Sequence, residues 1–141
     1  MIDIRITSEA IPGGELPGWS SDKAAGAVAS FVGLVRNRSG ARPDSAVVRL
    51  EYEAYIPMAE RELLQISREC ESQYGALRIV VHHRVGVLAI GDVAVSIVVW
   101  TAHRDEAFGG CRYIIEEIKK RVPIWKREVF EDGAEWVNAH P

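Results

Sequence analysis

The chain has 141 residues, of which 48% are hydrophobic, and this is enough for one domain with a buried core. Its formal net charge of -3 argues against a general nucleic-acid-binding protein, which is usually basic over a whole face. Because no apolar run approaches the roughly 20 residues that span a membrane, and Met1 leads straight into a strand-like pattern without a signal-peptide core, we expect a cytoplasmic protein.

Three strand patterns separated by loops fill the first part of the chain. Residues 2–7 alternate strictly and predict a half-buried strand. Residues 26–36 are apolar on both faces and predict a central strand, in which Gly33 marks a bulge or a close backbone approach. Residues 47–55 alternate again and predict a strand with one wet face, because Arg49, Glu51 and Glu53 lie opposite an apolar face. That apolar face is expected to carry Val48, Leu50, Tyr52 and Ala54, and loops are expected over 8–24 and 37–44.

Two helices are predicted in the remainder. Pro57 suits the first turn of one helix, and Gly75 suits its C-terminal stop. Asp105 can cap the other, which should end near Arg121 because Pro123 biases the preceding residue away from helical geometry. Their apolar positions are Ala59, Leu63, Ile66, Cys70 and Tyr74 in the first, and Phe108, Cys111, Ile115 and Ile118 in the second. Strands are expected over 77–84, 93–100, 124–130 and 135–137, with a short segment between Gly86 and Gly91.

The order of these elements predicts the fold class. Strands dominate, two long helices interrupt them, and there is no regular βαβ alternation. This pattern indicates an α+β fold with a largely antiparallel sheet. Neither an internal repeat nor a linker is visible, so we expect residues 1–141 to form a single domain.

Residues 119–127 carry five positive charges and no negative one, on a chain that is otherwise acidic. The last turn of a helix favours cations, and this accounts for Lys119, Lys120 and Arg121. It does not account for Lys126 and Arg127, which lie beyond the break at Pro123. An anion-binding site and a solvated surface both remain open for this basic run.

Two further basic positions lie at the ends of predicted strands. His103 and Arg104 fall between a buried strand and a helix start, where the free backbone N–H groups form a natural seat for an anion. An imidazole and a guanidinium suit a phosphate there, and an exposed turn is the alternative. Arg36 is the first charge after the apolar run of residues 26–36, which alone is weak evidence.

The histidines and cysteines do not indicate a metal site. His82 and His83 are adjacent on a strand, so they point to opposite faces and cannot readily share a metal. Cys70 and Cys111 lie far apart, without a CxxC motif, on the apolar faces of predicted helices. We therefore expect buried, inert thiols in a reducing compartment, and no zinc site.

The candidates that remain are mostly cationic. Glu51 and Glu53 share one strand face and could act as an acid–base pair, although an exposed face is the simpler interpretation. The lysines, arginines and single histidine suit a polyanionic substrate and acid–base or amine chemistry, without a metal.

Five motifs follow one another along the chain. They are Gly26-Ala27-Val28 through Phe31-Val32-Gly33-Leu34-Val35-Arg36-Asn37; Leu50-Glu51-Tyr52-Glu53-Ala54-Tyr55; His83-Arg84-Val85-Gly86 with Gly91-Asp92; Ala102-His103-Arg104 with Ala107-Phe108; and Lys119 through Val122-Pro123-Ile124-Trp125-Lys126-Arg127-Glu128 with Trp136-Val137. In this order they resemble the large, catalytic subunit of molybdopterin synthase. The match runs from about residue 2 to the C-terminus and is weakest over residues 8–24 and the loop after Asn37.

The resemblance implies an α/β hammerhead fold and a homodimer with a small sulfur-carrier subunit at each end, which together form a heterotetramer. The carrier resembles ubiquitin, and its Gly-Gly tail ends in a thiocarboxylate that inserts into a pocket of the large subunit. The sulfurs of two carriers are transferred in turn to cyclic pyranopterin monophosphate, which gives the dithiolene of molybdopterin in molybdenum cofactor biosynthesis. The implied activity is that of a sulfurtransferase without a cofactor.

The same resemblance suggests roles for the basic residues. Lys119 matches an active-site lysine that meets the thiocarboxylate and helps to transfer sulfur, and Lys126 matches one that neutralises the substrate or protonates a leaving group. A lysine crowded by other cations should also have a lowered pKa. The family's anion-binding residues, which hold the phosphate, are matched by Arg36, His103 and Arg104.

One position departs from the family, and one alternative function stays open. His140 stands where an arginine is expected to reach into the partner subunit's pocket, and the sequence stops soon after Ala139, where relatives often continue. The alternative function is a non-catalytic module that binds anionic ligands or a protein tail through the same basic pocket. An ordinary surface without a site is the third interpretation.

Overall fold

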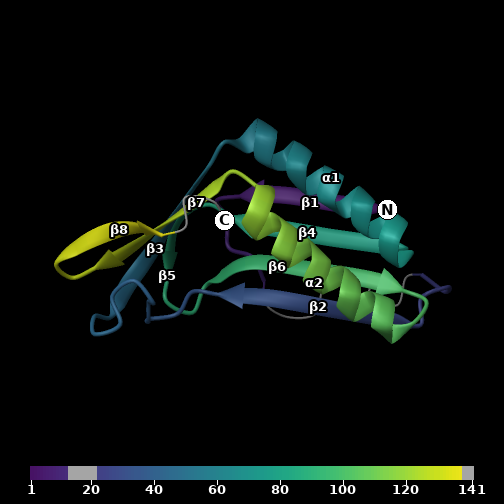
Figure 1. Cartoon of the computed structure of the whole chain (residues 1–141), viewed down its shortest axis with the longest axis horizontal. Coiled ribbons are helices and arrows are strands. Elements are labelled where there is room, and N and C mark those ends of the chain that lie inside the picture. Colours follow the sequence, from purple (N-terminus) through teal and green to yellow (C-terminus); the bar gives the residue numbers. More distant parts are fainter. Residues whose placement is uncertain (13–21, 138–141) are drawn as a thin grey trace.

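The computed structural model describes residues 1–12 and 22–137. Within them the chain forms two four-stranded sheets and two helices, which confirms the predicted α+β class (Figure 1). The first sheet has the order β1 (Ile2–Thr7), β4 (Arg78–Arg84), β6 (Val93–Thr101), β2 (Ala27–Leu34). The second sheet has the order β5 (Gly86–Ala89), β3 (Val47–Ala54), β7 (Ile124–Phe130), β8 (Gly133–Val137).

The strand pairing is largely antiparallel, as expected. Of the described pairs only β1 and β4 run parallel, with Ile4 opposite Val81. The central strand β6 is apolar and buried along nearly its whole length, because strands flank it on both sides and a helix covers one face. No helix in the described ranges has the length and apolarity to cross a membrane.

Both helices, α1 (Ile56–Tyr74) and α2 (Arg104–Arg121), cover one face of the first sheet (Figure 1). The first turn of α1 contains Pro57, and Gly75 ends the helix in the left-handed conformation with φ of 64°. Its backbone N–H closes the last turn on the carbonyl of Glu71 at 3.0 Å. The predicted ends of α1 are therefore confirmed.

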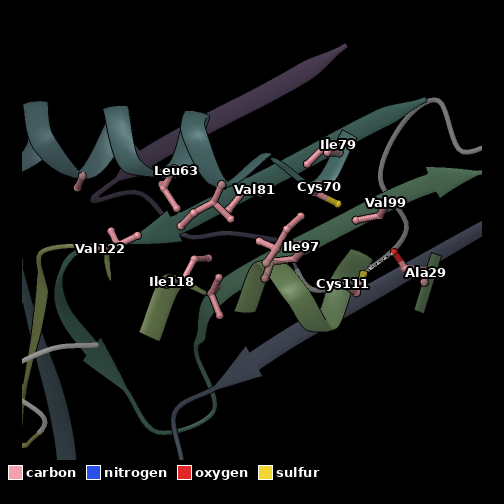
Figure 2. Close-up of a cluster of buried hydrophobic side chains, with 14 of the residues drawn as sticks. Ala29, Leu63, Cys70, Ile79, Val81, Ile97, Val99, Cys111, Ile118 and Val122 are labelled. Atoms are coloured by element: carbon pink, nitrogen blue, oxygen red, sulfur yellow. Dashed lines mark hydrogen bonds between the residues drawn. The ribbon is translucent and has the colours of Figure 1, made fainter. Parts of the chain in front are cut away.

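The main hydrophobic core lies between the two helices and the first sheet (Figure 2). Leu63 and Cys70 of α1 meet Val81 and Ile97 of the sheet, and all four side chains are fully buried. On the α2 side, the Cys111 thiol donates to the carbonyl of Ala29 at 3.2 Å.

The predicted central position of the second strand is wrong. β2 is the outer strand of the first sheet and pairs only with β6 among the described strands. Its apolar side chains Phe31 and Leu34 are consequently 38% and 61% exposed. Gly33 is confirmed as a bulge and a close approach, because the register shifts between Gly33 and Leu34 and a Cβ on Gly33 would lie 2.7 Å from Val95 Cγ1.

The start of α2 and its buried face also differ from the prediction. The helix begins at Arg104 after His103, so Asp105 lies in the first turn and does not cap it. Phe108 is 67% exposed, whereas Gly110 faces the core, where a Cβ would lie 3.0 Å from the Cys70 sulfur. The helix packs so closely on α1 that its inner face needs small residues, which a search for large apolar side chains overlooks. The buried positions are Ala107, Gly110, Cys111, Ile114 and Ile118.

A second irregularity changes the face of β3. The pairing with β7 shifts between Val47 and Arg49, so Val47 is buried and Val48 is exposed, contrary to the strict alternation expected. From Leu50 onward the expected faces are recovered. The described part of the predicted loop over 8–24 contains no regular element, and residues 13–21 and His140 lie outside the described residues.

Candidate active site

A pocket of about 310 Å³ opens where the C-terminal end of α2 meets both sheets. Its charged lining consists of three cations, Arg36, Lys119 and Lys126, and one carboxylate, Glu128. Tyr52 and His83 add polar groups, and apolar side chains such as Ile115 and Ile124 complete the wall. A cavity with apolar walls and a few convergent polar groups is typical of a small-molecule site.

The three cations reach the pocket from different elements. Lys119 lies in the last turn of α2, which ends when the N–H of Val122 binds the carbonyl of Ile118 at 3.1 Å. After Pro123 the chain enters β7, where Lys126 pairs with Tyr52 of β3. The Pro123 break thus turns the chain so that two lysines seven residues apart face one cavity.

Arg36 enters from the other side. It directly follows Val35, whose N–H donates to the carbonyl of Asp92 at 2.9 Å and whose carbonyl accepts from Gly91 at 2.7 Å. These two bonds fix the backbone at the end of β2, directly before Arg36. Sequence reasoning singled out all three cations, and the structure brings all three together.

The electrostatics of the pocket favour a proton-releasing lysine. Burial lowers the pKa of Lys126, the charges of Lys119 and Arg36 lower it further, and the carboxylate of Glu128 opposes them. A lowered pKa was expected from crowding by cations, although burial is the larger cause. A lysine of this kind can give up a proton nearer to neutral pH.

His83 is a pocket residue that sequence reasoning considered only as a metal ligand. Its Nδ1–H donates to the carbonyl of Arg84 at 2.8 Å, because a carbonyl can only accept, and Nε2 therefore carries the lone pair. Burial lowers its pKa to about 4, and the charge of Lys119 acts in the same direction. The ring stands edge-on to Tyr52, with 5.3 Å between the two ring centroids. Because its pKa is lowered by burial, the imidazole in this pocket is neutral at pH 7.

Glu128 and Tyr52 were also missed as site residues, although both lie in the family-like motifs. Alternation along β7 was the available signal, since residues 126 and 128 share a strand face. Burial raises the pKa of Tyr52 to about 12, and the charge of Glu128 contributes. Tyr52 therefore carries a neutral hydroxyl at pH 7.

The other three charges of residues 119–127 form ion pairs outside the pocket. Arg121 binds Glu69 at 2.6 Å and also Glu62 and Glu117, which ties α1 to α2. Lys120 is exposed and lies 3.4 Å from Glu117. Arg127 pairs with Glu51 at 3.3 Å, which leaves that carboxylate in an ion pair outside the pocket rather than in an acid–base pair with Glu53.

His103 and Arg104 are not brought to the pocket of the same chain. Both are exposed at the N-terminal end of α2, and neither lines the cavity. Because a helix rises 1.5 Å per residue, His103 lies about 24 Å along α2 from Lys119. Any joint role of these residues needs a second molecule.

A metal centre finds no support in residues 1–12 and 22–137. No group of three or more histidine, cysteine or acidic side chains among them could hold a metal ion. Cys70 and Cys111 are buried free thiols whose pKa burial raises to about 12 in both cases, so they are poor nucleophiles, as expected.

Comparison with known proteins gives consistent matches. A family described as "MoaE protein" matches residues 6–121. A molybdopterin synthase catalytic subunit from Nostoc sp. is 43% identical over 126 residues, which cover 88% of this chain and 74% of the relative. The structure of molybdopterin synthase from Staphylococcus aureus superposes with a TM-score of 0.85 at 41% identity, covering 94% of each chain.

A more distant structure shares the fold. It is a complex of subunits 1 and 2 of the molybdopterin-converting factor from Helicobacter pylori, with a TM-score of 0.75. The matched chain is 22% identical, and the match covers 99% of this chain and 93% of that one.

Proposed function

This chain belongs to the MoaE protein family, and on that premise we propose that it is the catalytic subunit of a molybdopterin synthase in molybdenum cofactor biosynthesis. In this role it is a sulfurtransferase, which moves sulfur from the thiocarboxylate of a small carrier subunit to cyclic pyranopterin monophosphate. The observation that carries the proposal is the convergence of Arg36, Lys119 and Lys126 on one pocket. Both substrates are anions, and three cations in a partly apolar cavity suit them.

We assign the steps to residues by position. Lys119, at the end of α2, meets the thiocarboxylate of the carrier tail and assists the transfer of sulfur. Lys126 neutralises the substrate or protonates a leaving group, a task that its lowered pKa favours. Arg36 holds the phosphate, since a guanidinium binds phosphate oxygens in a bidentate manner.

The partner we propose is a small ubiquitin-like subunit with a Gly-Gly thiocarboxylate tail. A relative with the same fold has been solved as a complex of two subunits, and this supports a two-subunit enzyme. A tail that ends in two glycines has no side chains to accommodate there, which suits a cavity of about 310 Å³. A cytoplasmic location belongs to the same proposal, and the buried free thiols are compatible with it.

A homodimer is also part of the proposal. His103 and Arg104 match anion-binding residues of the family, yet they lie about 24 Å along α2 from Lys119 of their own chain. A second copy of the chain can supply them. The outer strand β2, with Phe31 and Leu34 exposed, and the exposed Phe108 of α2 offer apolar surface for such a contact.

The test is a mixing assay. The native chain, a thiocarboxylated carrier and cyclic pyranopterin monophosphate are combined, and molybdopterin is detected through its fluorescent oxidation product. Lys119→Ala should abolish the product while carrier binding persists, whereas Lys120→Ala, which alters an exposed neighbour outside the pocket, should retain it. No product from the native chain, despite a tight complex with the carrier, would instead indicate a non-catalytic binding module.

A further inference from the structure

The loop between β2 and β3 is attached to the pocket wall through a buried side chain. Ser39, three residues after Arg36, is only 6% exposed, and its hydroxyl donates to the carboxylate of Glu128 at 2.5 Å. Glu128 is itself 5% exposed and lines the pocket. The contact joins positions 89 residues apart in the sequence and connects the Arg36 side of the cavity to the Lys126 strand.

The Ser39 hydroxyl takes part in a second hydrogen bond, in which it is the acceptor. The Ser39 oxygen accepts the backbone N–H of Ala41 at 3.0 Å, so the serine proton is free to point at Glu128. Farther along the loop, Arg42 binds Asp132 at 2.7 Å and lies over the Phe130 ring at 4.4 Å. That second attachment is at the surface, because the Asp132 side chain is 73% exposed.

A buried carboxylate in a pocket that binds anions needs an explanation. It repels an anionic ligand, and its burial is unfavourable unless hydrogen bonds and opposite charges compensate. Glu128 has both, namely the Ser39 hydroxyl and the ammonium of Lys126, which lies two residues earlier on the same face of β7. Glu128 therefore accepts the Ser39 hydroxyl directly and acts on Lys126 through its charge.

We propose that Ser39 is a positioning residue of this pocket, which acts through Glu128 to hold Arg36 and Lys126 in their relative places. The inference rests on the proposed function, since the placement of these two cations matters only if the pocket is the reaction site. A direct consequence concerns the proton of Lys126. When the serine hydroxyl is removed, the carboxylate of Glu128 loses a competing hydrogen bond and interacts more strongly with the ammonium of Lys126. The pKa of Lys126 should then rise.

The charged and titratable groups around Lys126 determine how a change in its pKa is interpreted. Tyr52 and His83 are neutral at pH 7, and Lys119 and Arg36 are cations, so Glu128 is the carboxylate that the pocket lining offers to Lys126. Glu135 of β8, the register partner of Glu128, is exposed and does not line the pocket. The titratable and charged groups to be considered are Arg36, Tyr52, His83, Lys119, Glu128 and Glu135.

The experiment follows the titration of Lys126 by NMR in protein labelled with ¹³C-lysine, with the signal assigned by its loss in Lys126→Gln. Ser39→Ala should raise the pKa of Lys126 by about half a unit or more, because the carboxylate loses its competing donor. Glu128→Gln should move the pKa in the opposite direction. Asp132→Asn, which breaks the exposed attachment of the same loop, is the matched control and should leave it unchanged.

Turnover provides the second measurement. Ser39→Ala should raise KM for the phosphorylated pterin by a factor of roughly 2 to 10, as expected for the loss of the one hydrogen bond that ties the loop after Arg36 to Glu128. It should also move the alkaline limb of the pH profile upward, and Ser39→Thr, which keeps the hydroxyl, should restore both. A Ser39→Ala protein with native titration of Lys126 and native KM would overturn the inference, even if its melting temperature fell.

The two proposals fail in different ways. If the native chain makes no molybdopterin, the proposed function fails, while the titration of Lys126 still reports whether Ser39 acts through Glu128. If the native chain is active and the Ser39→Ala and Glu128→Gln titrations do not diverge, the function stands and the positioning role is refuted. If Ser39→Ala does not fold, an unchanged Lys126 in Glu128→Gln still refutes the role, and Ser39→Cys, whose thiol is a much weaker donor, replaces Ser39→Ala in the comparison.

Discussion

The neutral imidazole of His83 should make the protein lose stability in mild acid. Burial holds its pKa at about 4, against an ordinary value of 6.5. Between these two pH values the imidazole of His83 binds a proton in the unfolded chain and stays neutral in the folded chain. The contribution of His83 to stability is therefore fully present above pH 6.5 and is lost as the pH falls through this window toward 4.

The magnitude follows from the two pKa values. Integration of the proton uptake between about pH 7.5 and about pH 5 gives a loss of about 2 kcal/mol, and roughly 3 kcal/mol when the pH has fallen below the folded pKa. For a domain whose total stability is on the order of 10 kcal/mol, this is readily measurable.

The assay is urea unfolding of the native protein and His83→Asn at about pH 7.5 and about pH 5. Asparagine keeps a donor near the Nδ1 position and does not titrate. The variant starts from lower stability because the ring contact with Tyr52 is lost, but only its change with pH is compared. All other titrating groups are common to both proteins, so the difference between the two pH dependences isolates His83.

We expect the native protein to lose about 2 kcal/mol more than the variant between the two pH values. Equal losses in both proteins would show that the imidazole accepts a proton in the folded state. The pocket would then hold one more cation at low pH, and the assignment of His83 as a neutral acceptor would be wrong.

Three further substitutions test the packing that supports the site. Gly26→Ala places a Cβ 2.2 Å from the carbonyl oxygen of Ala102, so urea unfolding should show a loss of about 1–3 kcal/mol, and native stability would refute the close contact. Leu63→Ala empties a fully buried position and should cost about 2–5 kcal/mol in the same assay, with a loss well below this range contradicting the assigned burial. Arg121→Gln removes the ion pair with Glu69, but both side chains are about a quarter exposed, so we expect only about 1 kcal/mol, screened at high salt. Because Arg121 lowers the pKa of Glu69 to about 2, this stability is present above pH 4.5 and disappears as the pH falls through 2, which a pH series of melting temperatures would reveal.

Local sequence chemistry determined most of the elements. The left-handed stop at Gly75 and the break at Pro123 depend on a single residue and its neighbours, so they could be predicted without knowledge of the fold. The same holds for the buried character of β6, which follows from a continuous apolar run. The site could be predicted in part, because Lys126 lies beyond the break at Pro123 and the end of the helix therefore does not account for its charge.

Only the tertiary structure decided which side chains share a neighbourhood. An apolar run has the same sequence pattern in a central strand and in an edge strand, so the sequence could not show that β2 lies at the edge of its sheet. Likewise, Gly110 lies on the inner face of α2 because of its close approach to Cys70, which no local pattern encodes. The same limit applies to partners: His103 and Arg104 resemble the other anion-binding residues, yet their distance along α2 separates them from Lys119.

The sequence by itself therefore determined the elements, the basic run and the family-like motifs of this protein. The fold decided that two of the five charges in that run, together with Arg36, form a pocket, and that the others form ion pairs. It also placed Ser39 against Glu128 across 89 residues. Backbone propensity acts over a few residues, whereas burial and electrostatic contact depend on which distant segments the sheets bring together.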